Sequence, residues 1–191
     1  MDQSALMSRA DDLSKLGLGF TAPNPIVGCI IVDSNNIVIA EEFHNGGAHA
    51  ESKAINSIKI IPPGATLFTT LEPCNHQGKT EPCSDLIIKS GIKNVIYSIT
   101  DPNSVAQGGS KKLREAGLNV TSGVLSEKVE FTNRHWLQKI KTGRPYFTWK
   151  IAMTLDGKIA ALDGSSKWIT SAESRDEVSR LRSQADAVLI G

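Results

Sequence analysis

The chain has 191 residues, enough for one full domain and the start of a second. Its 21 lysines and arginines nearly balance 20 aspartates and glutamates, and this formal net charge of +1 argues against a polynucleotide-binding protein. No apolar run approaches the roughly 20 residues of a membrane span, and the N-terminus lacks the features of a secretion signal, so we expect a cytoplasmic protein.

Apolar residues predict alternating helices and strands over most of the chain. The first helix is marked by apolar residues at helical spacing between Ala5 and Leu16. In chain order we then expect strands at 26–32 and 37–42, a helix at 48–58, a strand at 67–71, a helix from Cys83 to Gly91, a strand at 95–99, a helix near 110–116, a strand at 118–121 and a helix at 126–141. This alternation predicts an α/β fold with helices on both faces of a sheet.

A domain boundary is predicted near residue 144. Residues 141–145 are polar and contain glycine and proline, so we divide the chain into residues 1–144 and 145–191. The second part is expected to hold a strand at 146–152, a helix at about 172–183 and an apolar run at 187–190. Because so short a segment does not normally bury a core of its own, we expect the truncated start of a second domain.

Residues that bind metals cluster between positions 49 and 83. His49, Cys74 and Cys83 supply one imidazole and two thiols, and each cysteine follows a proline. Three such ligands leave the fourth position of a tetrahedral zinc ion open for water, which is typical of a catalytic site. Cys29 is expected to be a buried small hydrophobic residue, and the odd number of cysteines argues against a disulfide framework.

Glu51 is the acidic residue expected to act beside this cluster. Zinc lowers the pKa of a bound water to roughly 7, and a nearby carboxylate can take the proton and pass it to a departing amine. His-x-Glu followed by Pro-Cys is the order found in zinc deaminases. His49 and Glu51 are about 200° apart around an ideal helix, so they can converge only at its irregular first turn.

The segment from Pro73 to Cys83 narrows the choice of deaminase. It reads PCNHQGKTEPC and resembles the PCxHxGxTxPC pattern of the riboflavin-biosynthesis deaminase/reductase family. Further matches are Asn24-Pro25-x-Val27-Gly28, His49-Ala50-Glu51, Asp101-Pro102-Asn103, Gly143-Arg144-Pro145, Leu155-Asp156-Gly157 and Trp168-Ile169-Thr170. The resemblance implies a cytidine-deaminase-like three-layer α/β/α sandwich, followed by the start of a dihydrofolate-reductase-like α/β domain.

The resemblance also implies a reaction and a set of site residues. The family's zinc enzyme hydrolytically deaminates a diaminopyrimidinone ribosylamino-phosphate, and its second domain reduces the ribose with NADPH. One Zn²⁺ would be held by His49, Cys74 and Cys83, with Glu51 as the catalytic residue. The substrate-binding residues implied are Asn24, His44, His76, Lys79, Asp101 and Asn103 in the first domain and Ser166 and Arg182 in the second. Ala152, Trp168 and Thr170 would bind NADPH, although we expect no reductase activity from this chain alone.

Other interpretations stay open at this level. A deaminase acting on guanine, cytidine or an RNA adenosine would use the same zinc ligands, although the long insert with Lys79 argues against it. A structural zinc site could take His76 as a fourth ligand, which would leave Glu51 without a role. The polar loop residues and Arg182 could simply face solvent. We expect a small phosphorylated partner and no nucleic acid or membrane, and these features are compatible with a homo-oligomer.

Overall fold

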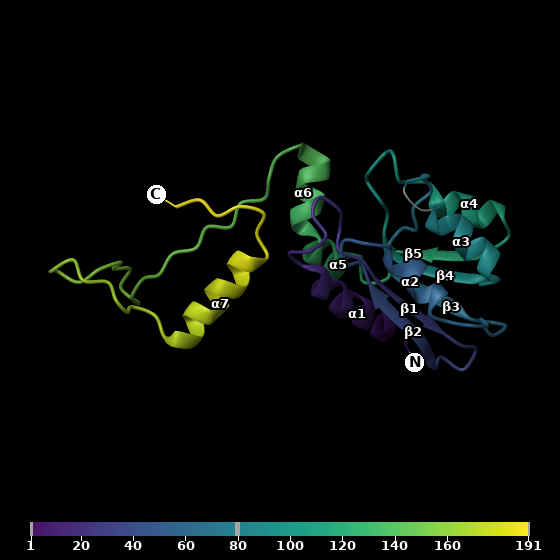
Figure 1. Ribbon diagram of the computed structural model, residues 1–191, viewed down its shortest axis with the longest axis horizontal. Coiled ribbons are helices and arrows are strands. Elements are labelled where there is room, and N and C mark those ends of the chain that lie inside the picture. Colours follow the sequence, from purple (N-terminus) through teal and green to yellow (C-terminus); the bar gives the residue numbers. More distant parts are fainter. Residues whose placement is uncertain (1, 79–80, 191) are drawn as a thin grey trace. The chain divides into compact units, whose positions relative to one another are not determined.

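The computed structural model describes residues 2–78 and 81–190 and divides into two compact units between Tyr146 and Phe147. The helices of the first unit are α1 (Gln3–Ser14), the short 3₁₀ helix η1 (Lys15–Gly17), α2 (Ala50–Asn56), α3 (Cys83–Ser90), α4 (Gly109–Glu115), α5 (Ser126–Thr132) and α6 (Arg134–Thr142) (Figure 1). Its strands are β1 (Gly28–Val32), β2 (Val38–Phe43), β3 (Thr66–Leu71), β4 (Asn94–Ile99) and β5 (Asn119–Ser122). In the second unit the helix is α7 (Ala172–Ser183).

These strands form one mixed sheet in the order β2-β1-β3-β4-β5. β1 pairs antiparallel with β2 and β3, whereas β3, β4 and β5 run parallel. Neighbouring parallel strands need a crossover connection, usually a helix. In this chain α3 connects β3 to β4, and α4 connects β4 to β5. The ends of β3 and β4 therefore lie at the same edge of the sheet.

Helices cover both faces of this sheet. Along β1, Cys29 and Ile31 belong to one buried apolar cluster, and Ile30 and Val32 belong to another. Successive side chains of a strand point to opposite faces, so the two clusters lie on opposite sides of the sheet. Residues of α2 and α3 contribute to the first cluster, and residues of α1 contribute to the second. The predicted α/β fold with helices on both faces is confirmed.

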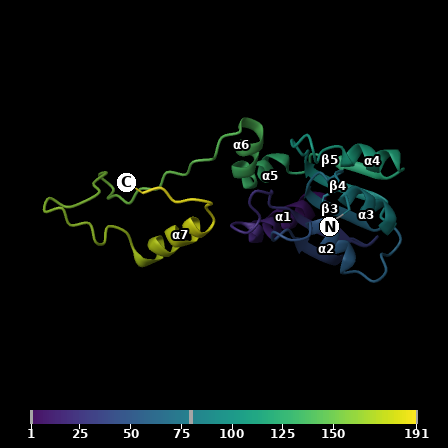
Figure 2. The ribbon, with the colours of Figure 1, turned by 45° about the horizontal axis from the view of Figure 1, so that its top comes forward.

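The prediction of a single helix at 126–141 is wrong. The structure has α5 and α6 in its place, lying next to each other (Figure 2). The break falls at Asn133, which has φ −91° and ψ 12°. This ψ is far from the helical value of about −42°, and asparagine favours such turns because its side chain competes for backbone hydrogen bonds.

The strand expected at 146–152 is also wrong, because residues 145–154 contain no helix or strand. A strand needs a neighbour for its backbone N–H and C=O groups, and the described residues of the second unit offer none. Phe147, Trp149 and Leu155 are exposed, and α7 contains no buried residue. Of the helices in the described part of the chain, none combines the length and apolar character that crossing a bilayer needs.

Gly28 lets α1 pack directly on β1. A Cβ atom at position 28 would lie 1.9 Å from the carbonyl oxygen of Ala10. We expect Gly28→Ala to displace α1 and to lower the free energy of unfolding by about 1–3 kcal/mol or more, as overpacking does. Urea denaturation followed by circular dichroism measures this change. Gly47→Ala is the matched control, since its Cβ would meet nothing closer than Asn45 Oδ1 at 3.8 Å. Equal stability of the two variants would contradict the close packing.

Candidate metal centre

Three potential metal ligands meet where α2, the loop after β3 and α3 come together. The ligand atoms of His49, Cys74 and Cys83 all lie within 4.8 Å of one another. The Nδ1 atom of His49 lies 3.3 Å from Sγ of Cys83 and 3.5 Å from Sγ of Cys74. At tetrahedral zinc with usual bond lengths, an imidazole nitrogen and a thiolate sulfur are about 3.6 Å apart. The donor types and their spacing therefore fit a zinc ion.

The start of α2 brings His49 and Glu51 to this point. His49 is the N-cap residue, with φ −64° and ψ 153°, so it leaves the helix in an extended conformation. Glu51 lies in the first turn, where its side chain is buried. The thiol of Cys83 donates to Oε2 of Glu51 at 3.7 Å. The two side chains thus converge at an irregular first turn, as the sequence predicted.

Cys74 caps the start of α3. The backbone N–H of Cys83 donates to Sγ of Cys74 at 3.4 Å, and the N–H of Ser84 donates to the carbonyl oxygen of Cys74 at 3.1 Å. These groups have no acceptor within their own helix, because the first N–H groups of any helix lack one. The partial positive charge of a helix N-terminus also favours a thiolate. Cys74 is therefore held in place by the helix that begins with Cys83.

Close contacts and burial shift the pKa values of these groups. The close contact with the Cys83 side chain lowers the pKa of Cys74 to about 4, whereas the same contact and burial hold the pKa of Cys83 well above its usual value. Burial raises the pKa of Glu51 to about 7, against the opposing effect of His49. Cys74 is therefore the thiol of the pair that loses its proton more readily. Binding of a cation would favour loss of the second proton.

A cavity of about 320 Å³ lies beside the three ligands. Its lining includes the predicted residues Asn24, His44, His49, Glu51, Cys74, His76, Asp101 and Asn103. Lys79 lies outside the described residues. Within the described chain, Nε2 of His44 and Nδ1 of His76 are buried without a hydrogen-bond partner. A buried polar atom without a partner costs free energy, so these two nitrogens favour a polar ligand in the cavity.

Asp101 and Asn103 each use one oxygen to shape their own loop. The N–H of Asn103 donates to Oδ1 of Asp101 at 2.8 Å, and the N–H of Val105 donates to Oδ1 of Asn103 at 3.1 Å. Burial is the main cause that raises the pKa of the Asp101 carboxyl. These local hydrogen bonds therefore fix a loop that lines the cavity.

Glu72 is a cavity-lining residue that the sequence did not reveal. Its side chain is buried, and it accepts the N–H of Asp101 at Oε2 (3.2 Å) and the N–H of Ser110 at Oε1 (3.0 Å). It thus joins the end of β3 to the loop after β4 and to the start of α4. Its partners are backbone groups far away in the sequence, and only its position beside Pro73-Cys74 could have drawn attention to it.

Three lining residues of α6 were also missed, namely Trp136, Lys139 and Ile140. Their spacing places them on one face of a helix, since residues three and four positions apart are neighbours on its surface. The sequence signals only the helix, because nothing local indicates that this face turns toward residues 23–27. The tertiary structure decides that α6 forms part of the cavity wall.

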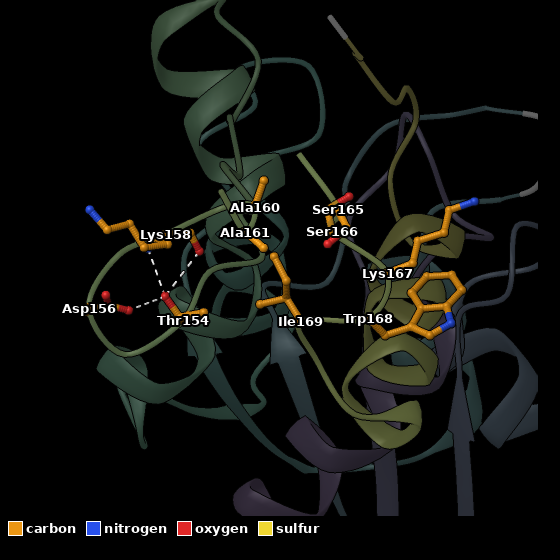
Figure 3. Close-up of a pocket in the computed structure, with 10 residues that line it drawn as sticks. All are labelled: Thr154, Asp156, Lys158, Ala160, Ala161, Ser165, Ser166, Lys167, Trp168 and Ile169. Carbon is orange, nitrogen blue, oxygen red and sulfur yellow. Dashed lines mark hydrogen bonds between the residues drawn. The ribbon is translucent and has the colours of Figure 1, made fainter. Parts of the chain in front are cut away.

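The residues expected to serve a reductase lie in the second unit. Ser166 and Trp168 line a separate cavity of about 530 Å³ (Figure 3). The guanidinium of Arg175 lies 4.3 Å from the ring centroid of Trp168. The remaining three, Ala152, Thr170 and Arg182, are not among the residues that line this cavity. The second unit therefore does not bring all five predicted residues together.

Comparison with known families gives the first unit an identity. Residues 1–99, more than half of the chain, match the family model described as the cytidine and deoxycytidylate deaminase zinc-binding region. The chain belongs to this deaminase family. The match confirms the predicted cytidine-deaminase-like fold and agrees with zinc as the metal of the three-ligand group. Residues 145–191 of the same chain match the RibD C-terminal domain.

Individual relatives match both parts of the chain. It is similar to the riboflavin biosynthesis protein RibD of Actinobacillus pleuropneumoniae, with 47% identity over 188 residues that cover 97% of this chain and 50% of that protein. RibD of Escherichia coli (strain K12) is 41% identical and is matched over 99% of this chain and 52% of its own length. The chain thus spans about half the length of these curated relatives. The resemblance to the riboflavin-biosynthesis family is confirmed.

A solved structure agrees with this similarity. The crystal structure of a diaminohydroxyphosphoribosylaminopyrimidine deaminase/5-amino-6-(5-phosphoribosylamino)uracil reductase from Thermotoga maritima has a TM-score of 0.88 and 45% sequence identity. The match covers 94% of this chain and 52% of that one. A C-terminal deletion mutant of Aspergillus oryzae Rib2 deaminase, at 17% identity and a TM-score of 0.57, shares the fold.

Replacement of the proposed ligand Cys74 by alanine should weaken zinc binding, whereas replacement of Cys29 by alanine should not. We expect Cys74→Ala to lower zinc affinity by more than about a hundredfold, because a ligand is lost outright, whereas loss of a supporting contact alone costs 10- to 100-fold. Competition with a chromophoric chelator, followed by metal analysis, measures the effect. Cys29→Ala should keep one zinc per chain, since Cys29 is buried and lies outside the ligand group. Equal zinc content of both variants would rule out Cys74 as a ligand.

Glu72→Gln should destabilise the first unit. The amide turns an N–H₂ group toward one of the two backbone N–H groups that the carboxylate now satisfies. We expect a loss of about 1–3 kcal/mol in the free energy of unfolding, the usual cost of an unsatisfied buried group. Thermal denaturation measures it. In the control Glu115→Gln, an exposed pair with Lys111 is removed, which should cost less than about 1 kcal/mol.

Proposed function

We propose that this chain is a zinc-dependent deaminase of riboflavin biosynthesis, which hydrolytically releases ammonia from a diaminopyrimidinone ribosylamino-phosphate. The observation that carries the proposal is the position of Glu51, buried beside the His49, Cys74 and Cys83 group and lining the adjacent cavity. The printed name of the Thermotoga maritima enzyme joins this deaminase to a reductase, which supports the same substrate class.

The ligand group has the composition of a catalytic rather than a structural zinc site. His49, Cys74 and Cys83 would hold the ion and leave one position for solvent. Zinc, when bound there, supplies Lewis acidity and lowers the pKa of water to roughly 7. His76, considered above as a fourth ligand, is not part of this group in the described chain. A closed site of four side chains therefore has no support.

Glu51 moves the protons in this proposal. Its carboxylate takes a proton from the attacking water and delivers it to a ring nitrogen of the substrate. As the tetrahedral intermediate collapses, the carboxylate takes the remaining proton of the added hydroxyl group and delivers it to the amine, which leaves as ammonia. A group works best in both directions when its pKa is close to the working pH, and burial is the main cause that raises the pKa of the Glu51 carboxyl above its usual range. Its position in the first turn of α2, two residues after His49, keeps the carboxylate next to the candidate metal ligands.

The cavity side chains would position the pyrimidinone. The unpartnered ring nitrogens of His44 and His76 offer hydrogen bonds to polar ring atoms. Nδ1 of His44 lies 3.1 Å from the carbonyl oxygen of Ala48, which orients the ring and leaves Nε2 for a ligand. Asn24, Asp101 and Asn103 complete the proposed substrate-binding residues, together with Lys79.

We further propose that the second unit serves a reductase step only within a complete reductase domain. Ser166 and Arg182 would then bind substrate, and the NADPH side would include Ala152, Trp168 and Thr170. The absence of a sheet among the described residues of this unit supports that restriction. The partner is a small phosphorylated molecule rather than nucleic acid or a membrane, and the cytoplasm is the proposed location.

Replacement of Glu51 by glutamine should separate zinc binding from catalysis. We expect Glu51→Gln to lower kcat for ammonia release by about 10²- to 10⁴-fold, which is the usual contribution of general acid–base catalysis. Zinc content should stay at one ion per chain, because the ligands are untouched. A coupled ammonia assay and metal analysis check both outcomes. Glu41→Gln, which removes an exposed pair with Arg9, should leave activity unchanged. An active Glu51→Gln enzyme would refute the proposed proton transfer.

A substrate panel tests the assignment itself. The zinc-loaded chain should release ammonia from the phosphorylated diaminopyrimidinone and should act at least about a hundredfold more slowly on guanine and cytidine. A site built to bind polar substrate groups strongly rejects analogues that lack them. Comparable kcat/KM values for guanine or cytidine would favour another deaminase of the same fold.

A further inference from the structure

Helix α6 forms a wall of the deaminase cavity that no family motif indicates. From one face of this helix, the apolar residues Trp136 and Ile140 and the basic residue Lys139 line the cavity. The same lining contains the acidic residues Glu51 and Asp101. Leu137 is buried in the core cluster that also contains residues of α2 and α3, and Trp136 packs against that cluster. The helix is therefore anchored, and its cavity-facing side chains start from a fixed backbone.

Lys139 is the one lysine or arginine among the described residues that line the cavity. The lining also contains three carboxylates, on Glu51, Glu72 and Asp101. Both oxygens of Glu72 accept backbone N–H groups, as described above. The carboxylates of Glu51 and Asp101 would repel an anionic ligand. A phosphorylated substrate needs a compensating cation at the end of the cavity that holds its phosphate.

The ammonium group of Lys139 is available for this role. Its side chain is exposed, and within the described chain it takes part in no ion pair. By contrast, Lys53 and Lys112 of the same unit are paired with Glu42 and Asp85. An ammonium group that forms hydrogen bonds to a phosphate gains more than a neutral donor does, because both partners are charged.

We propose that Lys139 binds the phosphate of the substrate, while Trp136 forms an apolar wall beside the bound molecule. This inference rests on the proposed deaminase function and adds to it a residue that determines specificity. In this arrangement α6 holds the phosphate, and the pyrimidinone lies next to Glu51 and the candidate zinc ligands. Lys139 takes no part in proton transfer, so it affects binding rather than the chemical step.

A comparison of two substrates distinguishes phosphate binding by Lys139 from a general loss of activity. The phosphorylated diaminopyrimidinone and its dephosphorylated counterpart are compared by ammonia release with the zinc-loaded 191-residue chain. For Lys139→Met we expect KM for the phosphorylated compound to rise about tenfold or more, as loss of one charge-assisted hydrogen bond predicts. Its kcat should stay within about threefold of the parent. For the dephosphorylated compound, kcat/KM should be unchanged, because no charge is there to bind.

Two further variants serve as controls. Lys139→Arg keeps the positive charge and should retain most of the preference for the phosphorylated compound. Lys141→Met removes an exposed lysine from the same helix, outside the cavity lining, and should leave both substrates unaffected. Circular dichroism establishes that each variant is folded.

The possible failures are distinguishable. If Lys139→Met lowers kcat/KM equally for both substrates, or changes neither, the phosphate contact is wrong while the deaminase assignment stands. If the parent chain does not prefer the phosphorylated compound, the same conclusion follows. If the zinc-loaded parent neither binds nor deaminates either compound, the proposed function fails and this inference fails with it.

Discussion

Two helices begin at the same point of this molecule, and the candidate site depends on that meeting. His49 precedes α2 and Cys83 opens α3, while Cys74 supplies both a sulfur and a carbonyl oxygen to the first N–H groups of α3. The positive ends of helices stabilise negative charge on nearby sulfur and carboxylate groups. One set of contacts therefore satisfies the helix start, lowers the pKa of a thiol and gathers three metal ligands.

The cavity lies where this fold class places ligands. β3 and β4 run parallel, Glu72 directly follows β3, and Asp101 lies two residues after the end of β4. Ligands of open α/β sheets bind outside the carboxyl ends of such strands. The side chain of Glu72 accepts the backbone N–H groups of Asp101 and Ser110. Since Glu72 directly follows β3 and precedes Cys74 by two residues, these bonds hold the Asp101 loop close to Cys74. Gly109 adds to this close packing, because a Cβ atom there would lie 1.7 Å from the carbonyl oxygen of Pro73.

The described lining of the cavity beside the candidate metal ligands runs from Pro23 to Ile140, within the first unit. The second unit instead leaves large apolar side chains such as Trp149 and Leu155 exposed. Such exposure is costly for an isolated domain, since apolar surface is normally buried against other elements. The first unit thus buries its own core, whereas the second, over residues 147–190, has no sheet on which these side chains could pack.

The sequence by itself determined the alternation of helices and strands, the three metal ligands and the convergence of His49 with Glu51. These features follow from periodicity, residue type and the geometry of a helix start, all of which are local properties of the chain. Only the tertiary structure decided that Asn133 divides one expected helix, that residues 146–152 form no strand, and that Glu72 and Lys139 face the cavity. The reason is physical: a strand exists only with a partner, and a buried carboxylate or a wall residue is defined by groups brought close from distant parts of the chain.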